Sequence, residues 1–186
     1  MLRRRIDVIL SLILVAVLFG VATSLGFSAL DSVRGYLPSA TIASSPNLGF
    51  HLVHILMRNV PAATFLFSGL ATAGLSSLVG IALIGSFAGA TTAASGAAIG
   101  LASTLGSVAI YAPIEFAGFF LAGAAGILPT VRAALNQSLP QPSPYLSFHA
   151  RYRGAFSVSL LLFLISLLIL AVAAYAEAAV IVTRRG

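Results

Sequence analysis

The fold of this chain is decided by residues 59–131, which read NVPAATFLFSGLATAGLSSLVGIALIGSFAGATTAASGAAIGLASTLGSVAIYAPIEFAGFFLAGAAGILPTV. This stretch holds one carboxylate, Glu115, and no lysine, arginine or histidine. The rest is apolar and rich in glycine and alanine. A helix that crosses the roughly 30 Å hydrocarbon core of a bilayer needs about 20 apolar residues. Residues 59–131 therefore predict several membrane-spanning helices.

The composition of the whole chain indicates the same class of protein. Of its 186 residues, 59% are hydrophobic and 8% are charged, a balance that is not found in soluble domains of this size. We predict an all-α fold, a polytopic integral membrane helix bundle that forms a single membrane domain over residues 1–186. The lipid bilayer is its expected partner.

We expect about five transmembrane helices, and the uncharged middle of the chain leaves six possible. An apolar run of about 20 residues near the N-terminus exceeds the 7–15 residues of a signal-peptide core, so we expect it to stay as an uncleaved first span. The expected spans are 8–27, 60–81, 85–107, 109–130 and 155–180.

The arginines, which supply all ten basic residues, help to orient the chain. With five spans and the N-terminus inside, six arginines lie on the inner side and four on the outer side, whereas six spans give five on each. We therefore expect a multi-pass protein of the cell membrane with a cytoplasmic N-terminus. Because the arginines stand at the edges of apolar segments, no nucleic-acid partner is expected. The all-arginine, alanine-rich composition hints at a prokaryotic source.

Residues 48–59 predict an interfacial amphipathic helix. His51, His54 and Arg58 recur at i, i+3 and i+7 and would form one polar face of a helix lying in the membrane interface. The histidine pair has no acidic third ligand nearby, so no metal site is expected. Asn59, just ahead of Val60 and a proline, is expected to be the helix cap of the second span.

Small residues spaced by four are candidates for helix packing. At that spacing they share one helix face and let a neighbouring backbone approach closely, either within one subunit or in a homo-oligomer. The pairs are Gly85 and Gly89, Gly96 and Gly100, and Ala122 and Gly126.

Glu115 and Glu177 are candidate functional intramembrane carboxylates. A charge buried in hydrocarbon costs at least about 2.5–3.5 kcal/mol, so each must be protonated, paired or close to the interface. Glu115 follows Pro113 and could simply begin a helix. Glu177 precedes Arg184 by two helical turns and could lie at the membrane boundary. Whether the two share a site is left open by the sequence.

No enzymatic activity and no cofactor are expected. The chain has no cysteine, which excludes thiolate chemistry and cysteine-ligated metals. It also has no GxSxG motif and no histidine within an expected span, so a nucleophile with its base is missing.

Two runs, EFAGFFLAGAAG at 115–126 and AAYAEAAVIVT at 173–183, resemble the stage II sporulation protein M family. There, one glutamate opens an alanine- and glycine-rich span and a second closes the last span ahead of a threonine. Arg58-Asn59 stands where the family tends to have paired asparagines. Members usually carry Pro-His-Gly before the first glutamate, whereas this chain has IYAPI at 110–114.

The resemblance implies a membrane scaffold. In spore formers the namesake helps to localise and assemble peptidoglycan-degrading enzymes, while relatives in other organisms have no assigned role. We therefore expect a non-enzymatic scaffold that recruits or anchors other membrane or cell-envelope proteins. The alternative is a small permease or transporter subunit in which Glu115 and Glu177 bind a proton or cation in a common cavity.

Overall fold

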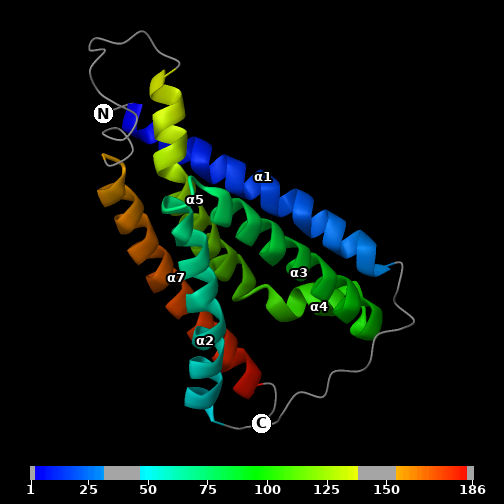
Figure 1. Ribbon diagram of the computed structural model, residues 1–186. Coiled ribbons are helices and arrows are strands. Elements are labelled where there is room, and N and C mark those ends of the chain that lie inside the picture. Colours follow the sequence, from blue (N-terminus) through cyan, green and yellow to red (C-terminus); the bar gives the residue numbers. More distant parts are fainter. Residues whose placement is uncertain (1–2, 32–46, 138–153, 184–186) are drawn as a thin grey trace.

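The computed structural model describes residues 3–31, 47–137 and 154–183, and these form helices joined by short turns (Figure 1). No strand occurs in these ranges, so the predicted all-α class is confirmed. The elements are α1 (Arg3–Asp31), α2 (Leu48–Phe67), the short 3-10 helix η2 (Ser68–Leu70), α3 (Leu75–Ile99), α4 (Leu101–Val108), α5 (Ala112–Gln137) and α7 (Phe156–Thr183).

Within the described part of the chain, four helices are long and apolar enough to cross a membrane. They are Ile6–Leu30 in α1, Leu75–Ile99 in α3, Ala112–Leu135 in α5 and Phe156–Thr183 in α7. The chain is therefore a multi-pass membrane protein in its helical architecture. α2 has 20 residues, also enough for a span, but histidine, arginine and asparagine side chains interrupt its apolar sequence.

The outer spans agree closely with the expected ranges, whereas the middle ones are displaced. The expected span 60–81 is wrong because α2 ends at Phe67 and the chain reverses before α3. Ala73 and Gly74 adopt positive φ angles of 51° and 91° at this reversal, and the Gly74 N–H donates to the Gly69 carbonyl at 2.7 Å. The expected span 85–107 is also interrupted, since α3 stops at Gly100, where φ is 87°.

The long helices alternate in direction. α1, α3 and α7 run from the end of the bundle that holds the N-terminus, and α2 and α5 run back toward it (Figure 1). Consequently α1 begins, α5 ends and α7 begins at one end, which we call the N-terminal end. The end of α7 and the start of α2 lie at the opposite end (Figure 1).

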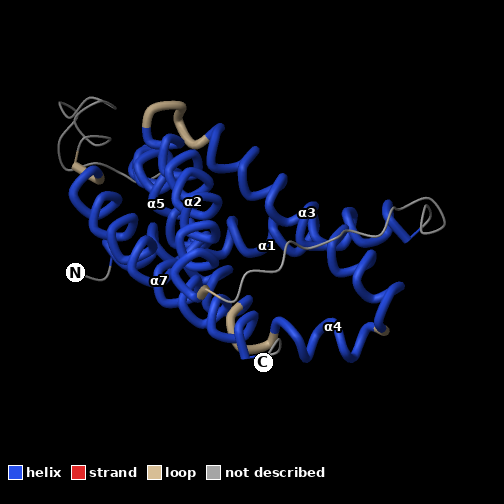
Figure 2. The backbone as a smooth tube through the Cα atoms, turned by 90° about the horizontal axis from the view of Figure 1, so that it is seen from below, coloured by secondary structure: helices blue, strands red, loops and turns tan. Residues whose placement is uncertain are grey.

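The helices form two groups. α1 lies along α3, and α4 packs on α3; α5 packs against α7, and both contact α2. The groups meet near the N-terminal end and diverge away from it, where α4 leads from α3 back to α5 (Figures 1 and 2). Outward-facing leucines and isoleucines such as Leu83 and Leu168 are well exposed, as expected for side chains that face lipid.

The main core fills the contact between the two groups. Val15 and Ile81 from the first group are fully buried against α5 and its neighbours. The Phe19 ring packs against Phe116 and Phe120, with ring centroids 4.8 and 5.0 Å away. α5 is thus the central helix, covered by α1 and α3 on one side and by α2 and α7 on the other.

Small residues allow the closest helix contacts. A Cβ on Gly89 would lie 2.0 Å from the Thr23 carbonyl oxygen of α1, and one on Gly85 would lie 2.8 Å from that of Phe19. On α5, a Cβ on Gly126 would lie 2.3 Å from the Leu66 carbonyl oxygen, and Ala122, one turn earlier, is fully buried. These contacts lie within a single chain, so these two faces are already occupied.

The third pair of small residues behaves differently. Gly100 is the turn between α3 and α4, and a Cβ added there would meet nothing within 4 Å. A Cβ added at Gly96 would make only ordinary van der Waals contact with Leu101, at 3.6 Å. Gly96 and Gly100 therefore form no packing face within the subunit, because the helix ends between the two positions.

Candidate functional site

A polar cluster joins α2, α5 and α7, and we define it as Arg58, Asn59, Glu115 and Glu177. The Asn59 side-chain Nδ2 donates a hydrogen bond to Glu115 Oε1 over 2.7 Å. Glu177 interacts electrostatically with both Glu115 and Arg58, and Arg58 also interacts with Glu115. The two candidate carboxylates come from helices far apart in the sequence, and they are close enough to interact electrostatically.

Asn59 points into the bundle because of its position on α2. The inward face of α2 repeats every four residues through His51, Ile55, Asn59 and Ala63, as helical periodicity requires. Asn59 is only 9% exposed. A buried amide needs a hydrogen-bond partner, and the Glu115 carboxylate supplies it.

The predicted role of Asn59 as a helix cap is wrong. α2 begins at Leu48, and its cap is Asn47, whose Oδ1 accepts hydrogen bonds from the backbone N–H groups of Gly49 (2.8 Å) and Phe50 (3.4 Å). In the sequence, Asn59 and Pro61 resemble a helix start because asparagine and proline are both common at helix starts. In the structure the helix continues through Pro61.

The predicted interfacial amphipathic helix is also corrected. His51 is 8% exposed and lies on the inward face, whereas His54 and Arg58 are exposed, so the three do not share one polar face. The His54 ring instead stacks on Phe50, with centroids 6.3 Å apart. Residues 48–59 are the first half of α2, and Ile55 packs with Ala174 and Ala178 of α7.

Glu115 lies at the start of a helix and also contacts a second helix. It lies in the first turn of α5, where a negative charge interacts favourably with the helix dipole, and its N–H donates to the Tyr111 carbonyl at 2.9 Å. Its side chain also reaches Asn59 on α2. The same carboxylate therefore favours the start of α5 and connects α5 to α2.

The chemistry of the cluster is that of a small cation or proton site. Two carboxylates and one amide provide oxygen ligands, which suit hard cations, while the Arg58 guanidinium can balance one carboxylate. The described residues contain no group of three or more His, Cys, Asp or Glu side chains that could hold a metal ion. A single proton or monovalent cation fits this ligand set better than a transition metal.

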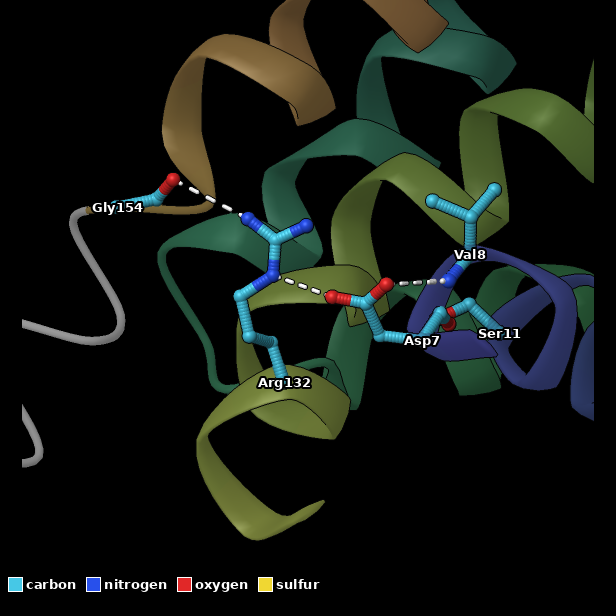
Figure 3. Close-up of polar contacts among 5 residues, drawn as sticks. All are labelled: Asp7, Val8, Ser11, Arg132 and Gly154. Atoms are coloured by element: carbon cyan, nitrogen blue, oxygen red, sulfur yellow. Dashed lines mark hydrogen bonds and ion pairs between the residues drawn. The ribbon is translucent and has the colours of Figure 1, made fainter. Parts of the chain in front are cut away.

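A second polar site, which the sequence analysis did not identify, lies at the N-terminal end (Figure 3). Arg132 of α5 donates from Nε to Asp7 Oδ2 of α1, and the two form an ion pair. Its Nη1 also donates to the carbonyl of Gly154, just before α7, at 3.2 Å. We call this arrangement the clasp. Its partners are 125 positions apart, and no local pattern could pair them.

The cluster and the clasp lie toward opposite ends of α5. Glu115 and Arg132 are separated by 17 residues, which at 1.5 Å per residue corresponds to about 25 Å along the helix. That separation approaches the thickness of the hydrocarbon core. The central helix therefore carries one polar site near each end of its membrane-spanning part.

Comparison with known proteins gives no match: no family model, no curated protein and no solved structure matches this chain. The resemblance to the stage II sporulation protein M family thus stays a prediction. What is known of the site comes from the residues themselves, namely two carboxylates, an amide and a guanidinium gathered from three helices.

Proposed function

We propose that this protein is a small permease or transporter subunit whose polar cluster binds a proton or a monovalent cation. The observation that carries the proposal is the 2.7 Å hydrogen bond between Asn59 of α2 and Glu115 of α5, with the Glu177 carboxylate of α7 within electrostatic range of Glu115. Ionisable residues within spans are costly and usually mark ion or proton pathways. Carboxylates on separate sides of the bundle would have argued for two unrelated structural roles.

In this proposal each member of the cluster has a distinct task. Arg58 balances one negative charge, so that the second carboxylate exchanges its proton or cation. Asn59 holds the Glu115 carboxylate in place through the 2.7 Å hydrogen bond. Because the two glutamates belong to different helices, loading the site changes the interaction between α5 and α7.

The test is ion flux in proteoliposomes that contain the purified protein, followed with pH-sensitive and cation-sensitive dyes. We expect Glu115→Gln and Glu177→Gln to abolish flux while the protein remains folded and inserted. Thr91→Val is a matched control, since Thr91 is exposed on α3 and its hydroxyl bonds within its own helix. Folded glutamine variants that transport like the unmodified protein would refute the proposal.

A scaffold is the second candidate function, and one structural feature favours it. α4 leaves the bundle and buries only Thr104, while Leu101, Leu105 and Ile110 at or near it remain about half exposed. Such an apolar arm suits another membrane or cell-envelope protein, or a second copy of the chain, as the resemblance to the sporulation family implies. In this case the protein would be a non-enzymatic anchor in the cell membrane.

Crosslinked affinity purification from native membranes separates the two functions. An envelope hydrolase that depends on the α4 arm, and is lost when Leu101 and Leu105 are changed to serine, would support the scaffold. An ATPase recovered in fixed ratio, unaffected by those changes, would support a transporter subunit.

A further inference from the structure

We propose that the Asp7–Arg132 clasp is a latch that holds the two helix groups together at the N-terminal end and opens when the groups rock relative to one another. The first group is α1, α3 and α4, and the second is α2, α5 and α7. The inference does not depend on what the polar cluster binds. It concerns a movement of the bundle and is tested by distances.

The first argument is the connectivity of the clasp. Arg132 ties α5 to α1 through Asp7 and to the start of α7 through the Gly154 carbonyl (Figure 3). The side chains of Arg132 and Asp7 are only 12% and 6% exposed. One guanidinium therefore connects a helix of the first group with two elements of the second.

The second argument is the clasp's own local support. Asp7 Oδ1 accepts a hydrogen bond from the Val8 N–H at 3.1 Å, and the Ser11 hydroxyl donates to the Asp7 carbonyl oxygen at 2.8 Å. The Asp7 residue is thus held in position by hydrogen bonds within its own helix.

The third argument is the nature of the remaining contact between the groups. Beyond the clasp most of it is apolar and closely packed: a Cβ on Gly123 of α5 would lie 3.0 Å from Ile81 and 3.4 Å from Val15. One buried polar contact also crosses it, in which the Ser77 hydroxyl of α3 donates to the Leu66 carbonyl oxygen of α2 at 2.5 Å. Apolar contacts are non-directional and tolerate small shifts of packed helices. The groups also diverge away from the clasp (Figure 1), and the short turn from α2 to α3 joins them at the same end, so a rocking motion turns about this connection.

The fourth argument is that the clasp has two alternative states of its own. Paired, the two charges satisfy one another in a nearly dry site. Separated, both need water, because an unpaired buried charge is strongly unfavourable. Arg132 Nη2 has no hydrogen-bond partner among the described residues. Such an all-or-none contact is the kind of element on which a two-state movement depends.

The experiment measures distances between pairs of nitroxide labels by double electron–electron resonance in lipid nanodiscs. Because the chain has no cysteine, labels attach only to the cysteines that are introduced. One pair spans the groups beside the clasp, at Ile9 of α1 and Leu161 of α7. The control pair lies within the first group, at Leu25 of α1 and Val79 of α3. All four positions are exposed.

The clasp is removed in one variant by Asp7→Asn and in a second variant by Asp7→Asn together with Arg132→Gln. The double variant leaves no unpaired charge. It can therefore still be tested if the single variant does not fold. We expect the Ile9–Leu161 distribution to gain a second, longer population in the variants, while the Leu25–Val79 distribution stays unchanged. Unchanged Ile9–Leu161 distances in the folded double variant would overturn the proposal. Equal broadening of both pairs would also overturn it, because that result means general loosening of the bundle.

Discussion

The Asn59 amide on α2 donates to the Glu115 carboxylate on α5 over 2.7 Å, although 56 positions separate the two residues in the sequence. This bond links α2, whose apolar sequence is interrupted by histidine, arginine and asparagine, to the central helix. Glu115 also interacts electrostatically with Arg58 of α2 and with Glu177 of α7. The polar cluster is therefore both a contact that holds α2 in the bundle and the candidate ion site.

Asn59→Ala is expected to destabilise the protein by about 1–3 kcal/mol, since the Glu115 carboxylate loses its donor in a buried position. Reversible unfolding in mixed micelles measures the change. Thr64→Ala is the control, because its exposed hydroxyl bonds only to Val60 of the same helix and should alter stability by less than about 0.5 kcal/mol. Equal effects of the two substitutions would mean that the Asn59–Glu115 bond does not hold α2.

Arg132→Gln alone is expected to cost about 3–5 kcal/mol, because the Asp7 carboxylate remains buried without its guanidinium. Asp7→Asn should have a similar effect, whereas the double variant should lose much less than the sum of the two. Unfolding free energies of the four proteins form a double-mutant cycle. Strict additivity would show that the ion pair contributes no coupling energy.

Gly89→Ala is expected to destabilise the α1–α3 contact by about 1–3 kcal/mol, since its Cβ would lie 2.0 Å from the Thr23 carbonyl oxygen. Gly20→Ala is the matched control on α1, where a Cβ meets nothing within 4 Å. There alanine should stabilise the helix by about 0.5–1 kcal/mol. Thermal unfolding of the purified variants should thus shift in opposite directions.

A cytoplasmic N-terminus predicts the sidedness of single cysteines. Ala134→Cys, near the end of α5, should react with an impermeant maleimide only after the cells are opened. Thr183→Cys, at the end of α7, should react from outside, since the described helices place these two positions at opposite ends of the bundle (Figure 1). The reverse pattern would invert the orientation, and labelling of both from one side would show that α7 does not cross the membrane.

The sequence was sufficient for the class of fold and for its outer helices. α1 and α7 are long apolar runs, so their ranges could be predicted within a few residues. The middle boundaries were misplaced because Asn59 and Pro61 resemble a helix start and because glycine occurs at many positions besides the true reversal at Gly74. In a stretch without charged residues, the sequence does not distinguish a glycine in a turn from a glycine inside a helix.

For the site, the sequence identified the residues better than their partners. Glu115 and Glu177 stand out as carboxylates in apolar sequence, but their meeting depends on how α5 and α7 pack, which has no local signal. The sequence around Asn59 predicts a helix cap, whereas the structure places this residue inside α2. Asp7 and Arg132 each look like ordinary residues at the edge of a span, so only the three-dimensional arrangement reveals the clasp.

The bond between Asn59 and Glu115 also has a consequence for synthesis at the ribosome. At about 5–20 residues per second, the 56 residues that separate them take roughly 3–11 s to follow. During that interval α2 has left the ribosome with its amide and guanidinium uncompensated, and neither α5 nor α7 exists to receive them. We therefore expect α2 to take its final place in the bundle only after α5 has been made, which makes its packing a late step of co-translational assembly.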